Sequence, residues 1–258
     1  MSCRVTILQT NIKWADPDAN QKALESALLS FEKSDLYVLP EMWNTGFLAG
    51  EESKDSLIHN SKFIIQNLKE LARRYDAAIA GSLDVEENGR RYNRFYFVTP
   101  TDTYYYDKRH LFSYAGEDKN FTAGKERNIV EWRGVKFLLQ VCYDLRFPCF
   151  SRNSLIADGI PPYDAIIYVA NWPASRRRVW DVLLQARALE NQCFVVGVNR
   201  VGDDPNCHYD GGSAIIDAKG KILAKVQDET AASATALLDM ESLNAFRAKF
   251  PVLRDADK

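Results

Sequence analysis

Residues 135–147 read Val135-Lys-Phe-Leu-Leu-Gln-Val-Cys-Tyr-Asp-Leu-Arg-Phe147, a mostly apolar run that becomes polar immediately after Cys142. The turn dipeptide Arg133-Gly134 precedes it, and an apolar run of this length predicts a buried strand rather than a helix. In open α/β folds, ligands bind at the C-terminal ends of the strands. A thiol at such an end is a candidate nucleophile, although a free cysteine is more often an inert buried residue.

Two more reactive side chains follow predicted strands. Glu41 comes directly after the strand 35–40, and Lys108 comes after the strand 104–106. Most glutamates and lysines are solvated surface residues, and that alternative applies to both. Apolar residues follow each of them closely, however, which favours partial burial. A carboxylate among apolar side chains has a raised pKa and can act as a base near neutrality.

Composition excludes several classes of protein. The 258 residues carry a formal net charge of −2, which gives no field to attract nucleic acid or an anionic membrane. No apolar run approaches the roughly 20 residues of a membrane span, and we expect no signal peptide. Five cysteines form no C-x-x-C pair, which favours reduced thiols and a cytoplasmic location over disulfides or a zinc site. Since there are only three histidines, the base for a nucleophilic cysteine is expected to be another residue.

Strands and helices alternate along the chain, with hairpins among them. This order predicts an α/β fold with mixed sheets, enough strands for two sheets, and helices on the outside. No linker or repeat interrupts it, so we expect a single domain over residues 1–258. Phosphate-binding loops and metal-ligand clusters are missing from the sequence, so we expect no cofactor and no metal. The predicted strands are 5–9, 35–40, 77–83, 94–98, 104–106, 129–132, 135–141, 164–170, 193–198, 213–216, 222–226 and 234–239, and the predicted helices are 17–31, 61–75, 150–158, 176–192 and 241–249.

Strand ends of one sheet can converge in space, so Glu41, Lys108 and Cys142 form a plausible catalytic site. Cysteine is a strong nucleophile but is mostly protonated at its free pKa of about 8.5. A glutamate can take the thiol proton and return it to a leaving amine, while a lysine stabilises the oxyanion. These three types together predict amide hydrolysis through a thioester.

The segments around these residues resemble the nitrilase superfamily, the carbon–nitrogen hydrolases with a Glu-Lys-Cys triad. The matching segments are Leu39-Pro-Glu41-Met, Tyr106-Asp-Lys108-Arg-His-Leu and Val141-Cys142-Tyr-Asp-Leu-Arg-Phe-Pro. Together with Tyr168-Val-Ala-Asn-Trp-Pro173, they look most like the bacterial omega-amidase branch. The resemblance implies a four-layer αββα sandwich with two mixed sheets, assembled as a homodimer.

The resemblance also implies roles for individual residues. Glu41 is the general base, Lys108 the oxyanion stabiliser and Cys142 the nucleophile, with the main-chain N–H of Tyr143 as second oxyanion donor. An auxiliary glutamate is expected after the lysine, and Glu117 matches it better than its rival Glu126. One departure is visible, because Cys149 stands where relatives commonly have a glutamate, which puts the local support of Arg146 in doubt.

The implied substrate is 2-oxoglutaramate or 2-oxosuccinamate, a short amide with a carboxylate at its far end. Arg146 matches the arginine that binds this carboxylate in relatives, although a structural ion pair is the alternative. Arg176, Arg177 and Arg178 are reserve cations. Asn171, Trp172 and Phe47 could line the pocket, and the aromatic pair could equally be core.

Three other functions remain open. The chain could belong to another branch of the superfamily, chiefly an amidase for deaminated glutathione. It could be a non-catalytic binding module that keeps the fold, although an intact triad argues against this. It could also be a thiol redox protein, with Cys149 as the resolving partner of Cys142.

Overall fold

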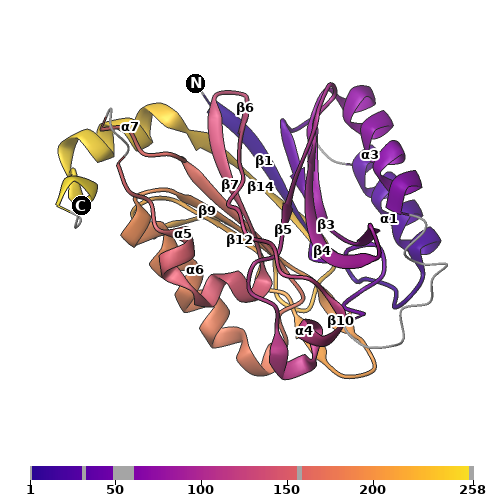
Figure 1. Ribbon diagram of the computed structural model, residues 1–258. Coiled ribbons are helices and arrows are strands. Elements are labelled where there is room, and N and C mark those ends of the chain that lie inside the picture. The colour runs from indigo at the N-terminus through magenta and orange to yellow at the C-terminus, as the bar shows by residue number, and fades with distance from the viewer. Residues whose placement is uncertain (1, 31–32, 49–60, 156–158, 256–258) are drawn as a thin grey trace.

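The computed structural model describes residues 2–30, 33–48, 61–155 and 159–255. Two six-stranded sheets face each other (Figure 1). The first sheet has the order β14(Ala232–Asp239), β1(Ser2–Gln9), β2(Leu36–Val38), β3(Ala78–Glu87), β4(Arg90–Val98) and β5(Thr103–Asp107). The second has the order β13(Ile222–Lys225), β12(Ala214–Ile216), β9(Phe194–Asn199), β8(Ala165–Ala170), β7(Val135–Val141) and β6(Ile129–Trp132).

Each sheet mixes parallel and antiparallel pairs. β1, β2 and β3 are parallel neighbours in the first sheet, as are β7, β8 and β9 in the second. Hairpins and antiparallel pairs complete the edges on either side of each parallel trio. The predicted mixed sheets are therefore confirmed.

Side chains alternate between the two faces of each sheet. Along β7, Phe137, Leu139 and Val141 pack into the core between the sheets, while Leu138 packs into the layer toward the outer helix. This period of two follows from strand geometry, in which successive side chains point to opposite faces. Both faces are buried, which explains why the run is almost continuously apolar.

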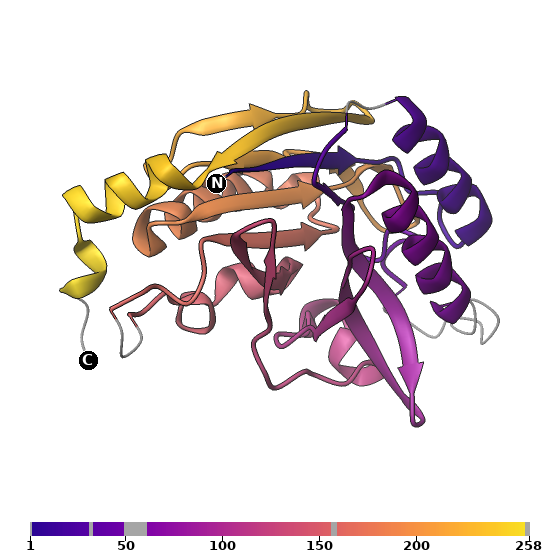
Figure 2. The ribbon, with the colours of Figure 1, turned by 90° about the horizontal axis from the view of Figure 1, so that it is seen from above.

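Helices cover the outer faces. α1(Pro17–Ser30) and α3(Ser61–Tyr75) lie outside the first sheet, and α6(Arg177–Asn191) lies outside the second (Figures 1 and 2). On α3, Ile64, Leu68 and Leu71 recur at helical spacing and pack on the sheet. The layers are helix, sheet, sheet and helix, so the expected four-layer αββα sandwich is confirmed.

Three further α-helices and a small hairpin complete the described fold. They are α4(Glu117–Asn120), α5(Pro148–Ser151), α7(Met240–Lys249) and the two-stranded hairpin of β10(Val201–Asp203) and β11(His208–Asp210). The predicted helix 150–158 is wrong in its bounds, because α5 ends at Ser151 and residues 152–155 are not helical. Residues 156–158 of that prediction lie outside the described part of the chain.

Candidate active site

Cys142 occupies a sharp turn where β7 ends. Its φ of 45° lies in the left-handed region, and a short 3-10 helix, Cys142–Arg146, begins at this residue. A non-glycine residue in this region costs of order 1–3 kcal/mol, so the surrounding contacts must hold it there. One such contact is the Val141 amide, which donates to the Asp144 carboxylate at 2.9 Å. The turn brings the thiol out of the sheet core into a cavity.

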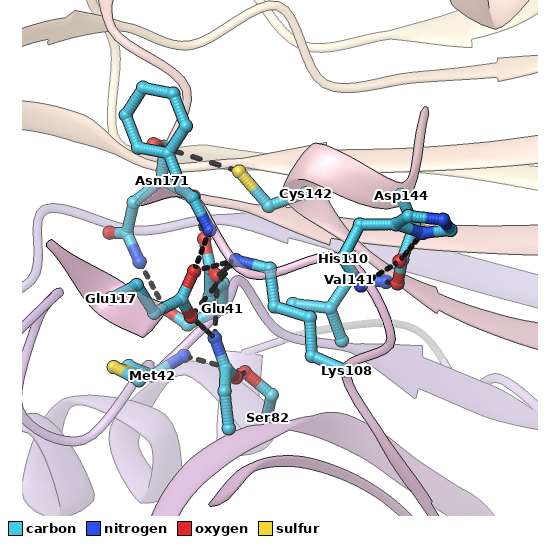
Figure 3. A network of polar contacts seen from close by, with 12 residues as sticks. Glu41, Met42, Ser82, Lys108, His110, Glu117, Val141, Cys142, Asp144 and Asn171 are labelled. Atoms are coloured by element: carbon cyan, nitrogen blue, oxygen red, sulfur yellow. Dashed lines mark hydrogen bonds and ion pairs between the residues drawn. The ribbon is translucent and has the colours of Figure 1, made fainter. Parts of the chain in front are cut away.

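Lys108 follows β5 and lies between two buried carboxylates (Figure 3). Its Nζ donates to Glu41 Oε1 at 2.9 Å and to the two oxygens of Glu117 at 3.1 and 2.8 Å. All three side chains are fully buried. Buried charges persist in a folded protein when they are paired and hydrogen-bonded, and both conditions hold here.

Glu117, rather than Glu126, is the glutamate that reaches Lys108. Glu117 opens α4 and is buried, whereas Glu126 is exposed. Glu117 Oε2 also accepts the amide of Phe112 at 2.6 Å, which ties the loop after β5 to the carboxylate. Of the two candidates from the sequence, the structure brings only Glu117 to the site.

Asn93, on β4, joins the two carboxylates and was missed by the sequence analysis. Its Nδ2 donates to Glu41 Oε1 at 2.7 Å and to Glu117 Oε1 at 3.0 Å. Its Oδ1 accepts from Ser82, which in turn accepts the amide of Met42 (Figure 3). The sequence carries little signal for it, because Asn93 lies in the half of β4 that also contains three arginines.

Asn171 connects Glu41 to the nucleophile. Its amide donates to Glu41 Oε2 at 2.8 Å, and its side-chain Nδ2 donates to the main-chain oxygen of Glu41 at 2.7 Å. Its own main-chain oxygen lies 4.0 Å from the sulfur of Cys142. The exit of β8 therefore fixes the base and the thiol relative to each other.

The local environment sets the charge state of the lysine and the carboxylate. Burial lowers the pKa of Lys108, but the adjacent Glu117 and Glu41 charges outweigh it, so the pKa lies above its ordinary value. Burial raises the pKa of Glu117 despite the opposing charge of Lys108 and the hydrogen bond from Asn93. Lys108 is therefore a permanent cation at physiological pH.

The thiol of Cys142 is neutral in the resting site. Burial raises its pKa well above the ordinary value, and the charge of Glu41 raises it further against the opposing effect of Lys108. Since the thiolate is the reactive form, the proton must be removed as the bond to the substrate forms. The site therefore needs an adjacent base, and Glu41 is the carboxylate in position.

Glu41, Lys108 and Cys142 line a cavity of about 330 Å³. Phe47, Phe112, Tyr143 and Trp172 form much of its apolar wall, and Arg146 and Arg176 supply positive charge. Its size and its few convergent polar groups are typical of a small-molecule site. The predicted pocket residues Arg146, Tyr143, Asn171 and Trp172 all line this cavity.

The three reserve arginines, Arg176, Arg177 and Arg178, differ in their position and their partners. Arg177 is paired with Asp181, Asp210 and Asp228, so it is structural. Arg178 is exposed and does not line the cavity. Arg176 is the one of the three that does.

A buried polar cluster braces the turn that carries Cys142. Asp144 accepts a hydrogen bond from the hydroxyl of Tyr106 at 2.8 Å. It also bonds the main-chain and ring nitrogens of His110 at 3.0 and 2.7 Å (Figure 3). These bonds connect the exit of β5, which carries Lys108, to the exit of β7. His110 and Asp144 had no predicted role, because they lie 34 positions apart and no local pattern pairs them.

Comparison with known proteins agrees with this geometry. The carbon-nitrogen hydrolase family model matches residues 4–248. The chain is a member of the carbon–nitrogen hydrolase family. This hydrolase is 46% identical over 99% of its length to an omega-amidase of Yersinia enterocolitica, covering 97% of that protein. It is 33% identical to a 2-oxoglutaramate amidase of Bacillus subtilis, with 100% and 99% of the two chains covered.

A solved structure gives the same picture. A CN-hydrolase superfamily protein from Xanthomonas campestris, with an arsenic adduct in its active site, superposes with a TM-score of 0.95. The two are 38% identical, with 100% of this hydrolase and 98% of that chain covered. The expected membership of the nitrilase superfamily is therefore confirmed.

Other features of the hydrolase bear on the remaining expectations. Within the described ranges, no helix is long and apolar enough to cross a membrane. In the same ranges, no group of three or more His, Cys, Asp or Glu side chains is arranged to hold a metal ion. All five cysteines are free thiols, and Cys149 is exposed.

Proposed function

We propose that the chain is an omega-amidase. It hydrolyses the terminal amide of a small 2-oxo dicarboxylic acid monoamide, such as 2-oxoglutaramate or 2-oxosuccinamate, to the 2-oxo acid and ammonia. The observation that carries the proposal is the Lys108 ammonium between the buried carboxylates of Glu41 and Glu117, beside Cys142 in a cavity that holds an arginine. The similarity to omega-amidases and 2-oxoglutaramate amidases supports the same activity.

In the first half-reaction, Glu41 takes the thiol proton while the sulfur of Cys142 attacks the amide carbon. The resulting oxyanion is stabilised by Lys108 and by the main-chain N–H of Tyr143. Tyr143 lies in the first turn of the 3-10 helix, where amides have no intrahelical partner. Once Glu41 is neutral, its hydrogen bond to Lys108 weakens and an N–H of the ammonium is released to the oxyanion. The C–N bond then breaks while the proton passes from Glu41 to the nitrogen. Ammonia is released, and the acyl group remains on Cys142 as a thioester.

In the second half-reaction, Glu41 removes a proton from water, whose oxygen attacks the thioester carbon. The same two donors stabilise the second oxyanion. Collapse of this intermediate breaks the C–S bond, releases the 2-oxo acid and returns the proton to Cys142. Glu117 stays bonded to Lys108 throughout and holds the ammonium in place.

Arg146 is proposed to bind the substrate carboxylate. Its guanidinium lies over the ring of Trp172 at 5.1 Å from the centroid, and no carboxylate among the described residues lies within 4.0 Å of it. The structural ion pair considered as its alternative is therefore not found in that part of the chain. An arginine forms planar bidentate bonds to a carboxylate, which suits the far end of a short amide.

We also propose that the chain is a single domain, works in the cytoplasm and forms a homodimer. The free thiols favour a reducing compartment. Exposed apolar side chains on α6 and β13 supply a surface for a second copy, namely Val182, Leu189, Ile222 and Leu223.

The deciding experiment is hydrolysis of 2-oxoglutaramate by wild type and Cys142→Ala, followed as ammonia release, with deaminated glutathione and glutamine in parallel. Cys149→Ser is the matched control, because it removes an exposed thiol seven residues away. We expect turnover of 2-oxoglutaramate that is lost in Cys142→Ala and kept in Cys149→Ser. Turnover of deaminated glutathione alone would move the chain to the other branch, and turnover by Cys142→Ala would contradict the thioester mechanism.

A further inference from the structure

The active-site cavity holds a second arginine that the proposed mechanism does not use. Arg176 is the last residue of a short 3-10 helix, Ala174–Arg176, that directly precedes α6, and its guanidinium lies 5.4 Å from the ring centroid of Phe112. Arg146 lies over Trp172 in the same way at 5.1 Å. Both arginines and both rings line the cavity. The cavity therefore presents two guanidinium groups, each supported on an aromatic ring.

Neither guanidinium is neutralised by a carboxylate. Within the described ranges, no Asp or Glu oxygen lies within 4.0 Å of Arg146 or Arg176, although the next residue, Arg177, has three such partners. Besides Glu41, the cavity wall includes the acid Asp204, whose Oδ1 accepts the amides of Asn206 and Cys207 at 2.7 Å. Its Oδ2 accepts the hydroxyl of Tyr209 at 2.6 Å. The hydrogen bonds of Asp204 are therefore made within the hairpin of β10 and β11.

The two arginines are held relative to each other and to the catalytic groups. The indole N–H of Trp172, which lies under Arg146, donates to the main-chain oxygen of Arg176 at 2.9 Å. The amide of Arg176 donates to Pro173, directly after Trp172. Phe112, which lies under Arg176, is bonded through its amide to Glu117 at 2.6 Å. These bonds fix the two supporting rings and the main chain of Arg176 in relation to the Lys108 site.

We propose that Arg176 is a specificity residue that recognises the 2-oxo group of the substrate, while Arg146 takes the adjacent carboxylate. This inference rests on the proposed omega-amidase function and names what selects its substrate. A guanidinium only donates hydrogen bonds, and a 2-oxo acid offers only acceptors at this end. The α-ammonium of glutamine would instead place a donor and a positive charge against a second fixed cation. The pair therefore admits 2-oxo acid monoamides and rejects the corresponding amino acid amide.

The test compares three amides that differ only at carbon 2, namely 2-oxoglutaramate, glutaramate with a methylene, and glutamine. Arg176→Gln should lower kcat/KM for 2-oxoglutaramate about 10- to 100-fold, the usual effect of losing hydrogen bonds to a charged group. The same change should alter kcat/KM for glutaramate by less than about threefold and raise that for glutamine. Arg176→Lys keeps the charge but not the planar guanidinium. Its kcat/KM for glutamine should therefore be as low as in wild type, while its kcat/KM for 2-oxoglutaramate should stay below the wild-type value.

Arg178→Gln is the matched control, because it removes the same charge at a position two residues along the chain. Arg178 is exposed and does not line the cavity. Its three kcat/KM values should equal those of wild type. Equal losses on 2-oxoglutaramate and glutaramate in Arg176→Gln, or no loss on either, would overturn the role of Arg176 while leaving the omega-amidase function intact. If wild type turns over none of the 2-oxo acid amides, the proposed function and this inference fail together.

Discussion

Replacing Lys108 by Met tests whether the buried charge network is organised as described. Methionine keeps the length and apolar stem of lysine but removes the ammonium that bonds to Glu41 and Glu117 at 2.8–3.1 Å. Removing one partner of a buried ion pair typically costs about 3–5 kcal/mol, because an uncompensated charge is left behind. With a urea m value of about 3 kcal/mol/M for a chain of this size, the unfolding midpoint should fall by roughly 1–1.7 M.

The loss of stability in Lys108→Met should also depend on pH. The pKa of Glu117 is already raised by burial, and without Lys108 the main influence that lowers it is gone. A carboxyl whose folded pKa exceeds its unfolded value of about 4.3 loses stability as the pH rises from that value through the folded pKa. The difference in unfolding free energy between wild type and variant should therefore be smallest near pH 5 and largest above pH 7.

The measurement is urea unfolding of both proteins at pH 5 and pH 8, together with ammonia release from 2-oxoglutaramate. Losing an oxyanion donor should reduce kcat about 10²- to 10³-fold. Lys119→Met is the control, since the same substitution at an exposed position of α4 should change neither stability nor rate. Lys108→Met/Glu117→Gln should be more stable than Lys108→Met, because one of the two stranded charges is gone. A variant as stable as wild type at both pH values would refute the reasoning.

Two further changes probe the support of the site. Gly124→Ala would place a Cβ 2.0 Å from the main-chain oxygen of Asp107, so the chain before Lys108 must shift. The free energy of unfolding should fall by about 1–3 kcal/mol, and the melting temperature and kcat should fall with it. An unchanged melting temperature would show that the contact is absent. Asn93→Ala removes one of the donors that lower the pKa of Glu117, so Glu117 should protonate at higher pH and the acid limb of the kcat/KM profile should move to higher pH. An unmoved limb with normal folding would argue against a role for Asn93.

Local patterns in the sequence were enough to predict the main elements of the fold. Apolar runs of strand length, helical spacing in 61–75 and turn dipeptides predicted mixed sheets, enough strands for two sheets, and helices on the outside, because these signals are read over a few neighbouring residues. The four-layer sandwich was implied by the family resemblance. The ends of individual helices and strands were less well predicted. The helix expected at 150–158, for example, ends at Ser151. The small hairpin of β10 and β11, which carries Asp204 and Tyr209 to the cavity wall, was missed because its strands are only three residues long.

The identity of the reactive residues was also local information. Glu41, Lys108 and Cys142 each follow a strand, and their types define the chemistry of an amidase before any contact is known. The sequence by itself determined the family, the reactive residue types and the apolar strands that build the sandwich, because each depends on residues close together in the chain.

Only the tertiary structure decided how those residues interact. Lys108 meets Glu41 across 67 positions and Asn171 meets Glu41 across 130, and no local pattern carries such pairings. The same is true of Asn93 between the two carboxylates, and of the choice of Arg176 over Arg177 as a cavity cation. The physical reason is that burial and pairing set the charge state of a side chain, and both depend on which strand ends the fold brings to one place.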